Sequence, residues 1–170
     1  MTRVLLLGLP GCGATTVGAA LAARTGWPFL DSSLLLERAT GGTAADLHAD
    51  EGEPALHRAD ADVVTLVLGM PAPLVACVPG AAVLDAALRQ RLRDGGYVVW
   101  LRAGVATLLA RLGTRVRPEL GDDPAAGLRR MSVDRAPLME QLADLVLDVD
   151  LLTPGQAARQ LVDALPSQPR

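Results

Sequence analysis

Short apolar runs alternate along the chain with segments whose apolar residues recur at helical spacing. The runs at 3–9, 74–78, 97–102 and 145–149 are almost continuously apolar, which is typical of buried parallel strands. A briefer strand is expected in WPFLDSS, residues 27–33, and it ends in polar residues. Five strands are therefore predicted.

Amphipathic segments between these runs predict helices. We expect them at 15–25, 33–40, 44–52, 83–93, 105–112, 125–143 and 154–165. Thr43 is a suitable N-cap for the helix that follows it, and Pro137 predicts a kink in another. Residues 55–68 are ambiguous, because 63–68 alone resembles a strand while the preceding residues favour a helix.

Strands and helices alternate, which predicts an α/β protein with helices on both faces of a parallel sheet. The fold class expected is a three-layer α/β/α sandwich with a five-stranded parallel sheet. We expect one domain over 1–166 and a frayed tail at 167–170. Residues 113–124 are polar and rich in turn formers, so they predict a mobile loop.

Composition excludes several classes of function. The net charge is −3 and only 2% of residues are aromatic, so neither a basic surface nor a base-stacking surface for nucleic acid is expected. All 16 basic residues are arginine, which excludes lysine-based covalent chemistry. Two cysteines form no metal motif or disulfide framework and favour a reducing, cytoplasmic compartment. No apolar stretch is long enough for a membrane span, and glycines and Pro10 make the N-terminal run a poor signal peptide.

The most informative segment is GLPGCGATT, residues 8–16. Gly8, Gly13 and Thr15 have the spacing of a phosphate-binding P-loop, but Ala14 occupies the lysine position. The segment lies between a predicted strand and a predicted helix, which is the context that a P-loop requires. Backbone amides around Gly11 and Gly13 would form an anion-binding nest at the helix N-terminus.

These features, taken in order, resemble the shikimate kinase family, and the resemblance covers almost the whole chain. The segments that carry it are the P-loop with TTVGAALAARTGWPFLDS, then LERATGGTAADLHADEGEPALHR, AAVLDAALRQRLRDGGYVVWL, RVRPEL and DRAPLMEQLADLVLDVD. The resemblance implies a P-loop kinase fold that transfers the γ-phosphoryl group of ATP to a hydroxyl of shikimate. It also implies that 55–68 is a helix and that 113–124 is a lid.

The resemblance assigns roles to individual positions. Nucleotide-binding positions are Gly11, Cys12, Gly13, Ala14, Thr15, Thr16, Arg111 and Arg117; metal-binding positions are Thr15 and Asp31; substrate-binding positions are Ser33, His57, Gly80 and Arg135. Arg117 and the position held by Ala14 are the catalytic ones. The implied cofactors are ATP and Mg²⁺, provided that nucleotide binding is retained.

Four departures from the family pattern fall in the same predicted pocket. Ala14 replaces the P-loop lysine, Ser33 replaces an acidic residue, and His57 replaces a substrate arginine. A triple-glycine substrate loop reads Pro79-Gly80-Ala81. We therefore expect a pseudokinase that acts by binding a small anion, a nucleotide or a protein partner. The alternative is an active kinase for shikimate or a related hydroxylated acid or cyclitol, with an arginine such as Arg117 or Arg115 in place of the lysine.

Several residues have a plain structural interpretation beside the functional one. Asp31 could be a helix N-cap, and Arg117 and Arg135 could be solvated surface charges. His57 could be a surface residue, and we expect His48 to be packed in the core. Cys12 could be a redox-sensitive thiol at a helix N-terminus, although filling a small position is the simpler interpretation.

Overall fold

The fold is known from a computed structural model, which describes residues 2–114 and 117–165. The strands are β1 (Arg3–Leu7), β2 (Phe29–Leu30), β3 (Leu74–Cys77), β4 (Tyr97–Arg102) and β5 (Leu145–Asp148). The α-helices are α1 (Ala14–Thr25), α2 (Ser32–Thr40), α3 (Ala44–Glu51), α4 (Glu53–Gly69), α5 (Ala86–Gly95), α6 (Val105–Leu112), α7 (Pro124–Leu142) and α8 (Pro154–Ala164). Two 3₁₀ turns, η1 (Gly80–Leu84) and η2 (Pro118–Leu120), complete the described part.

The strands form one parallel five-stranded sheet in the order β2-β3-β1-β4-β5. Leu5 in the central strand pairs with Ala76 on one side and Val98 on the other. Val4 to Leu7 are completely buried, which explains why the first apolar run has no polar alternation. The predicted fold class is confirmed.

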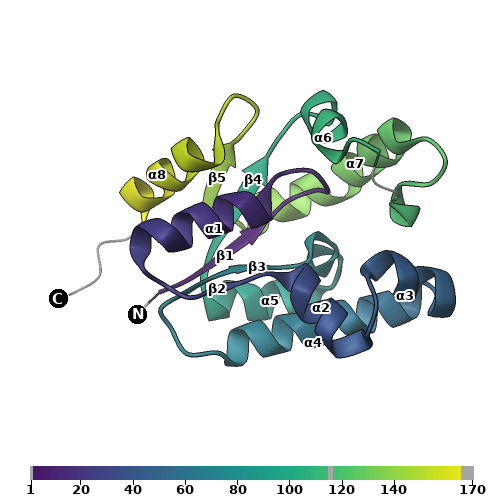
Figure 1. The fold of residues 1–170 in the computed structure, drawn as a ribbon, viewed down its shortest axis with the longest axis horizontal. Helices are drawn as coiled ribbons and strands as arrows, with labels where there is room; N and C mark the ends of the chain where they lie inside the picture. Colours follow the sequence, from purple (N-terminus) through teal and green to yellow (C-terminus); the bar gives the residue numbers. More distant parts are fainter. Residues whose placement is uncertain (1, 115–116, 166–170) are drawn as a thin grey trace.

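Helices cover both faces of the sheet. Helix α1 packs beside α8 on one side, and α4 lies with α5 on the other (Figure 1). Helices α2 and α3 pack against α4 and stand beyond the carboxyl ends of the strands. The loops that follow β1 and β3 also open at that end, which is where ligands bind in open α/β sheets.

The expected elements match the observed ones with few exceptions. Residues 55–68 are helical, as the resemblance implied, and Thr43 caps α3 through a capping box. The helix predicted at 83–93 is wrong at its start, because residues up to Leu84 form η1 and Asp85 caps α5.

The expected lid at 113–124 contains η2, and α7 already begins at Pro124. Pro137 lies inside α7, where a kink was expected. The expected tail at 167–170 lies outside the described residues. The mobility of the lid stays a prediction.

Candidate functional site

The loop between β1 and α1 is shaped by its glycines. Gly11 and Gly13 have φ values of 87° and 86°, in the left-handed region that other residues rarely adopt. A Cβ atom on Gly11 would lie 2.6 Å from the carbonyl oxygen of Leu108. The glycines whose spacing predicted a phosphate loop are therefore also needed for the backbone conformation and close packing of this loop.

The N-terminus of α1 offers free backbone amides. Gly13 is its N-cap and provides no side-chain cap. Within the described residues, the amides of Gly13, Thr15 and Thr16 donate no hydrogen bond. The Thr15 side chain is exposed and lines the adjoining cavity. Unpaired amides at the positive end of a helix dipole suit an anion such as phosphate.

Arg111 lies beside the loop but is held by its backbone. Its Nη1 donates to the carbonyl oxygen of Cys12 at 3.3 Å, and its Nη2 donates to that of Val149 at 2.6 Å. These contacts tie the P-loop to the chain after β5. Arg111 therefore lies beside the P-loop with its guanidinium already engaged, and its role in nucleotide binding stays a prediction.

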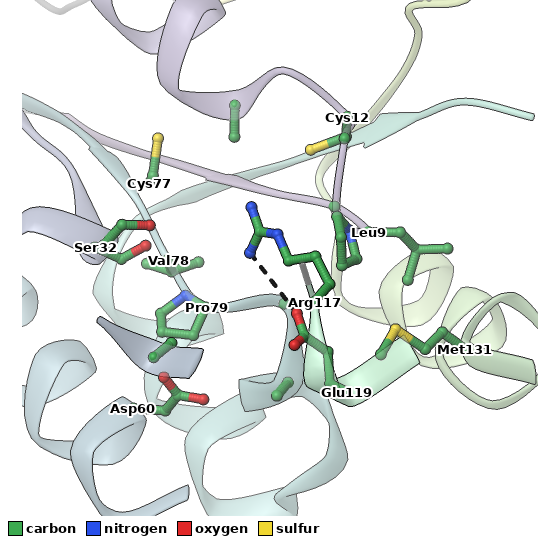
Figure 2. A pocket seen from close by; sticks show the side chains of 18 of the residues that line it. Leu9, Cys12, Ser32, Asp60, Cys77, Val78, Pro79, Arg117, Glu119 and Met131 are labelled. Atoms are coloured by element: carbon green, nitrogen blue, oxygen red, sulfur yellow. Dashed lines mark ion pairs between the residues drawn. The ribbon is translucent and has the colours of Figure 1, made fainter. Parts of the chain in front are cut away.

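Arg117 reaches the same cavity from the start of η2. Figure 2 shows its guanidinium between the P-loop residue Cys12 and Val78, with a dashed line to Glu119. Nη1 of Arg117 lies 3.7 Å from Oε1 of Glu119, and both side chains are partly exposed. Such a pair contributes roughly 1 kcal/mol or less, so Arg117 can exchange Glu119 for another anion at small cost.

One cavity of about 710 Å³ joins the P-loop to side chains from α2, α4, η1 and α7. Ser33, His57, Gly80 and Arg135 all line it, together with Ala14. The structure thus brings the predicted nucleotide and substrate residues to one hollow. Because Ala14 carries only a methyl group, it presents no charge to this space.

The two replaced substrate positions make modest contacts. Nε2 of His57 lies 3.5 Å from Oε1 of Glu53, and the His57 side chain is 49% exposed. Ser33 is exposed at the cavity edge. Arg58 follows His57 on the same helix, but it is exposed and is not part of the cavity wall, because one step along a helix turns a side chain by about 100°.

The changed substrate loop packs directly on the P-loop. A Cβ atom on Gly80 would lie 2.4 Å from the carbonyl oxygen of Gly8. Pro79 and Ala81 line the cavity on either side of this contact. The glycine that this loop retains is therefore required by packing, whether or not a substrate binds there.

Asp31 serves as the N-cap of α2. Its Oδ1 accepts a hydrogen bond from the amide of Ser33 at 2.8 Å, and the residue is only 7% exposed. The structural interpretation of Asp31 is thus realised. Its role as a metal ligand stays a prediction.

Asp60 is a cavity residue that the sequence analysis did not single out. It lies on α4, is 8% exposed, and lines the cavity together with Arg135 of α7. Burial raises the pKa of Asp60 to about 6, although the charge of Arg135 acts in the opposite direction. Burial likewise lowers the pKa of Arg135. Because an aspartate on a helix usually faces solvent, the sequence alone does not single out Asp60. Its place at the cavity becomes visible only from the packing of the helices.

The expectation for His48 is wrong, and the simpler interpretation of Cys12 is supported. His48 is not in the core: it is partly exposed on α3 and lines the cavity. Cys12 is buried, and burial raises the pKa of its thiol to about 11, so it is not an activated thiol. Cys12 fills a small space under the loop, since a Cβ atom on Gly8 would touch its sulfur.

Known proteins resemble the chain along most of its length. A family model described as shikimate kinase matches residues 10–166. A shikimate kinase from Symbiobacterium thermophilum is 36% identical over 167 residues, which cover 96% of this chain and 95% of the relative. One from Thermobifida fusca is 35% identical over 164 residues, covering 96% and 94%. The structure of shikimate kinase from Acinetobacter baumannii in complex with shikimate has a TM-score of 0.91 and 30% identity, covering 96% of this chain and 92% of that one.

Two further properties of the described residues bear on the site. No helix there has the length and apolarity needed to cross a membrane. Within the same residues, no group of three or more His, Cys, Asp or Glu side chains is arranged to hold a metal ion.

Proposed function

The chain belongs to the shikimate kinase family, and we propose that within it this protein is a pseudokinase, non-catalytic or very weakly active, that acts by binding. One observation carries the proposal. Ala14 stands at the lysine position of an otherwise intact P-loop, and it opens onto the cavity with an uncharged methyl group.

The missing cation matters because phosphoryl transfer is mainly positioning and charge neutralisation. The loss of one preorganised donor at a reacting centre costs about 3–4 kcal/mol of barrier, or about 10²–10³ in rate. Arg111 is held by two carbonyl groups and does not face the vacant position without breaking those bonds. The expected activity is therefore far below that of an ordinary kinase.

The acceptor side supports the same conclusion. Ser33 offers no carboxylate to an acceptor hydroxyl, and His57 contacts Glu53 rather than presenting a second guanidinium. Arg135 remains as a cation for a ligand carboxylate. The cavity retains the means to bind a small anionic molecule and lacks much of what would make it react.

The family implies ATP and Mg²⁺ as cofactors. The free amides at the start of α1 fit a phosphate group, and the Thr15 hydroxyl would face an accompanying Mg²⁺. We propose that a nucleotide or small anion binds there weakly and that a protein partner reads the bound state. Because both cysteines are free and buried, a reducing, cytoplasmic compartment suits the protein.

The decisive experiment measures ADP release from ATP and Mg²⁺ with shikimate as acceptor. The Symbiobacterium thermophilum relative, assayed in parallel, provides the reference rate. We expect this chain to fall at least about 10³-fold below it. Turnover within tenfold of the relative would refute the pseudokinase proposal.

An active kinase is the second candidate, and the position of Arg117 favours it. Its guanidinium projects into the cavity, and the ion-pair partner that the described residues give it is Glu119 at 3.7 Å. If Arg117 replaces the lysine, the Arg117→Ala variant loses turnover of shikimate or a related hydroxylated acid or cyclitol, while Arg58→Ala retains it. Arg115, the other arginine considered, lies outside the described residues.

A further inference from the structure

Asp60 and Arg135 are opposite charges that face one cavity without contact. Asp60 is 8% exposed, and the described residues provide no hydrogen bond or ion pair to its carboxylate or to the Arg135 guanidinium. No guanidinium nitrogen of Arg135 lies within 4.0 Å of a carboxylate oxygen of Asp60. Figure 2 shows the Asp60 carboxylate directed into the hollow between Pro79 and Glu119.

The separation means that neither charge is directly paired with the other. Burial raises the pKa of Asp60 and lowers that of Arg135, and the attraction between the two does not reverse either direction. A buried charge is ordinarily paired or neutralised. A ligand that carries both a cationic and an anionic group could pair with Asp60 and Arg135 at the same time.

The neighbouring carboxylates already have polar partners. Glu119 lies 3.7 Å from Arg117, and Glu53 lies 3.5 Å from His57. Both carboxylates also act on Arg135, and Glu119 acts on Asp60. A plain carboxylic acid would satisfy Arg135 but would bring a further negative charge towards Asp60 and Glu119.

We propose that the acceptor half of the cavity binds a small hydroxylated zwitterion, with its carboxylate on Arg135 and its ammonium on Asp60. This inference rests on the proposed function, because it takes the cavity to work by binding. A metal ion is a poorer occupant, since the described residues offer no cluster of three metal-ligating side chains. A neutral hydroxyl on Asp60 would leave the carboxylate charge uncompensated.

The test is calorimetric titration of the full chain without nucleotide. The probes are shikimate and its three aminodeoxy analogues, in each of which an ammonium replaces one ring hydroxyl. We expect at least one analogue to bind about tenfold tighter than shikimate, the gain typical of a charge-assisted hydrogen bond. The proposal fails if no analogue binds tighter than shikimate, or if none of the probes binds.

A matched pair of variants tests whether the preference for an aminodeoxy analogue over shikimate depends on the Asp60 carboxylate. Asp60→Asn removes the cavity charge, whereas Asp62→Asn removes an equal charge from an exposed position on the same helix. Asp60→Asn should abolish the preference, and Asp62→Asn should keep it. A preference that survives in Asp60→Asn overturns the assignment. The titrations contain no ATP, so they give the same answer whether or not the ADP-release assay detects turnover.

Discussion

At the scale of single residues, two positions define the site: Ala14, where a positive charge is missing, and Asp60, whose charge no described residue pairs. Ala14 lacks the cation that a P-loop presents to phosphate, and Asp60 carries a buried carboxylate that no described residue pairs. In our proposal, the missing charge weakens catalysis and the unpaired carboxylate costs stability. A buried carboxylate with a shifted pKa that lines a cavity is a candidate for a functional role.

Restoring the lysine should restore binding without turnover. We expect Ala14→Lys to raise affinity for a non-hydrolysable ATP analogue by about 10–100-fold, the gain of a charged hydrogen bond. Shikimate turnover should stay at background, because Ser33 and His57 are unchanged. Calorimetry and ADP release measure the two effects separately.

Two further variants are compared with Ala14→Lys. Ala19→Lys adds the same charge to an exposed position on α1 and should change neither property. The triple variant Ala14→Lys, Ser33→Asp, His57→Arg should gain turnover. Robust activity from Ala14→Lys alone would contradict our view of the acceptor pocket.

The Asp60 carboxylate should make stability depend on pH. Its pKa is about 6 in the folded chain against an ordinary 3.8, so the folded state binds the proton more tightly than the unfolded state. The destabilisation is absent below about pH 4 and complete above about pH 6, so stability falls as pH rises through this window. The shift corresponds to roughly 3 kcal/mol at most.

Asp60→Asn removes this penalty. We expect its free energy of unfolding to exceed that of the native chain by up to about 3 kcal/mol at pH 8 and to match it near pH 4. Urea unfolding at the two pH values measures the difference. Equal differences at both values would show that Asp60 is ionised at no cost.

At the scale of elements, Asp31 shows how one side chain serves the fold at the edge of the site. It caps α2 through the Ser33 amide. Asp31→Ala should lower the free energy of unfolding by about 1 kcal/mol, and Asp31→Asn should change it little, because asparagine caps as well as aspartate. Thermal unfolding measures both.

The cap at Asp85 provides the control. Asp85 accepts hydrogen bonds from the amides of Ala87 and Leu88 at the start of α5. Asp85→Ala should therefore lower the free energy of unfolding by an amount similar to that of Asp31→Ala. If Asp31→Asn loses as much as Asp31→Ala, the negative charge of Asp31 matters beyond the capping hydrogen bond, through its interaction with the dipole of α2.

Most elements could be predicted from the sequence, because their signals are local. The apolar run of β1, the Thr43 cap and the glycines around α1 each act through near neighbours in the chain. The start of α5 was misjudged because apolar spacing continues through Val83, whereas the Asp85 cap sets the boundary at Ala86. Apolar periodicity does not distinguish a 3₁₀ turn that leads into an α-helix.

The cavity wall was less predictable, because it depends on contacts between distant elements. Asp60 and Arg135 are 75 positions apart in the chain and meet only through the packing of α4 and α7 around η1. His48 was expected in the core, yet it faces the cavity because α3 packs on α4 at the end of the sheet. The resemblance supplied Arg135 but gave no reason to examine Asp60.

At the scale of the whole molecule, the strand order explains why binding and reaction can be separated. With β1 between β3 and β4, the P-loop lies beside the loop that follows β3 (Figure 1). Residues of α4 and α7 line the cavity next to these loops. The scaffold is held together by fully buried side chains of the sheet and helices, and Ala14 is only partly buried against this core. A chain can therefore lose the reacting centre and keep the cavity.

This separation predicts weak nucleotide binding that depends little on magnesium. The amide nest remains, but Ala14 adds no charge, so we expect a Kd of roughly 1 mM for a non-hydrolysable ATP analogue. At 1 mM analogue this gives a rise in Tm of about 1–2 °C for a chain of this size. Thermal unfolding with Mg²⁺ and with EDTA measures the shift, and Ala14→Lys should enlarge it. A shift near 10 °C in the native chain that EDTA abolishes would mean that another group, with Arg117 the nearest candidate, supplies the missing charge, and the protein would then be a working kinase.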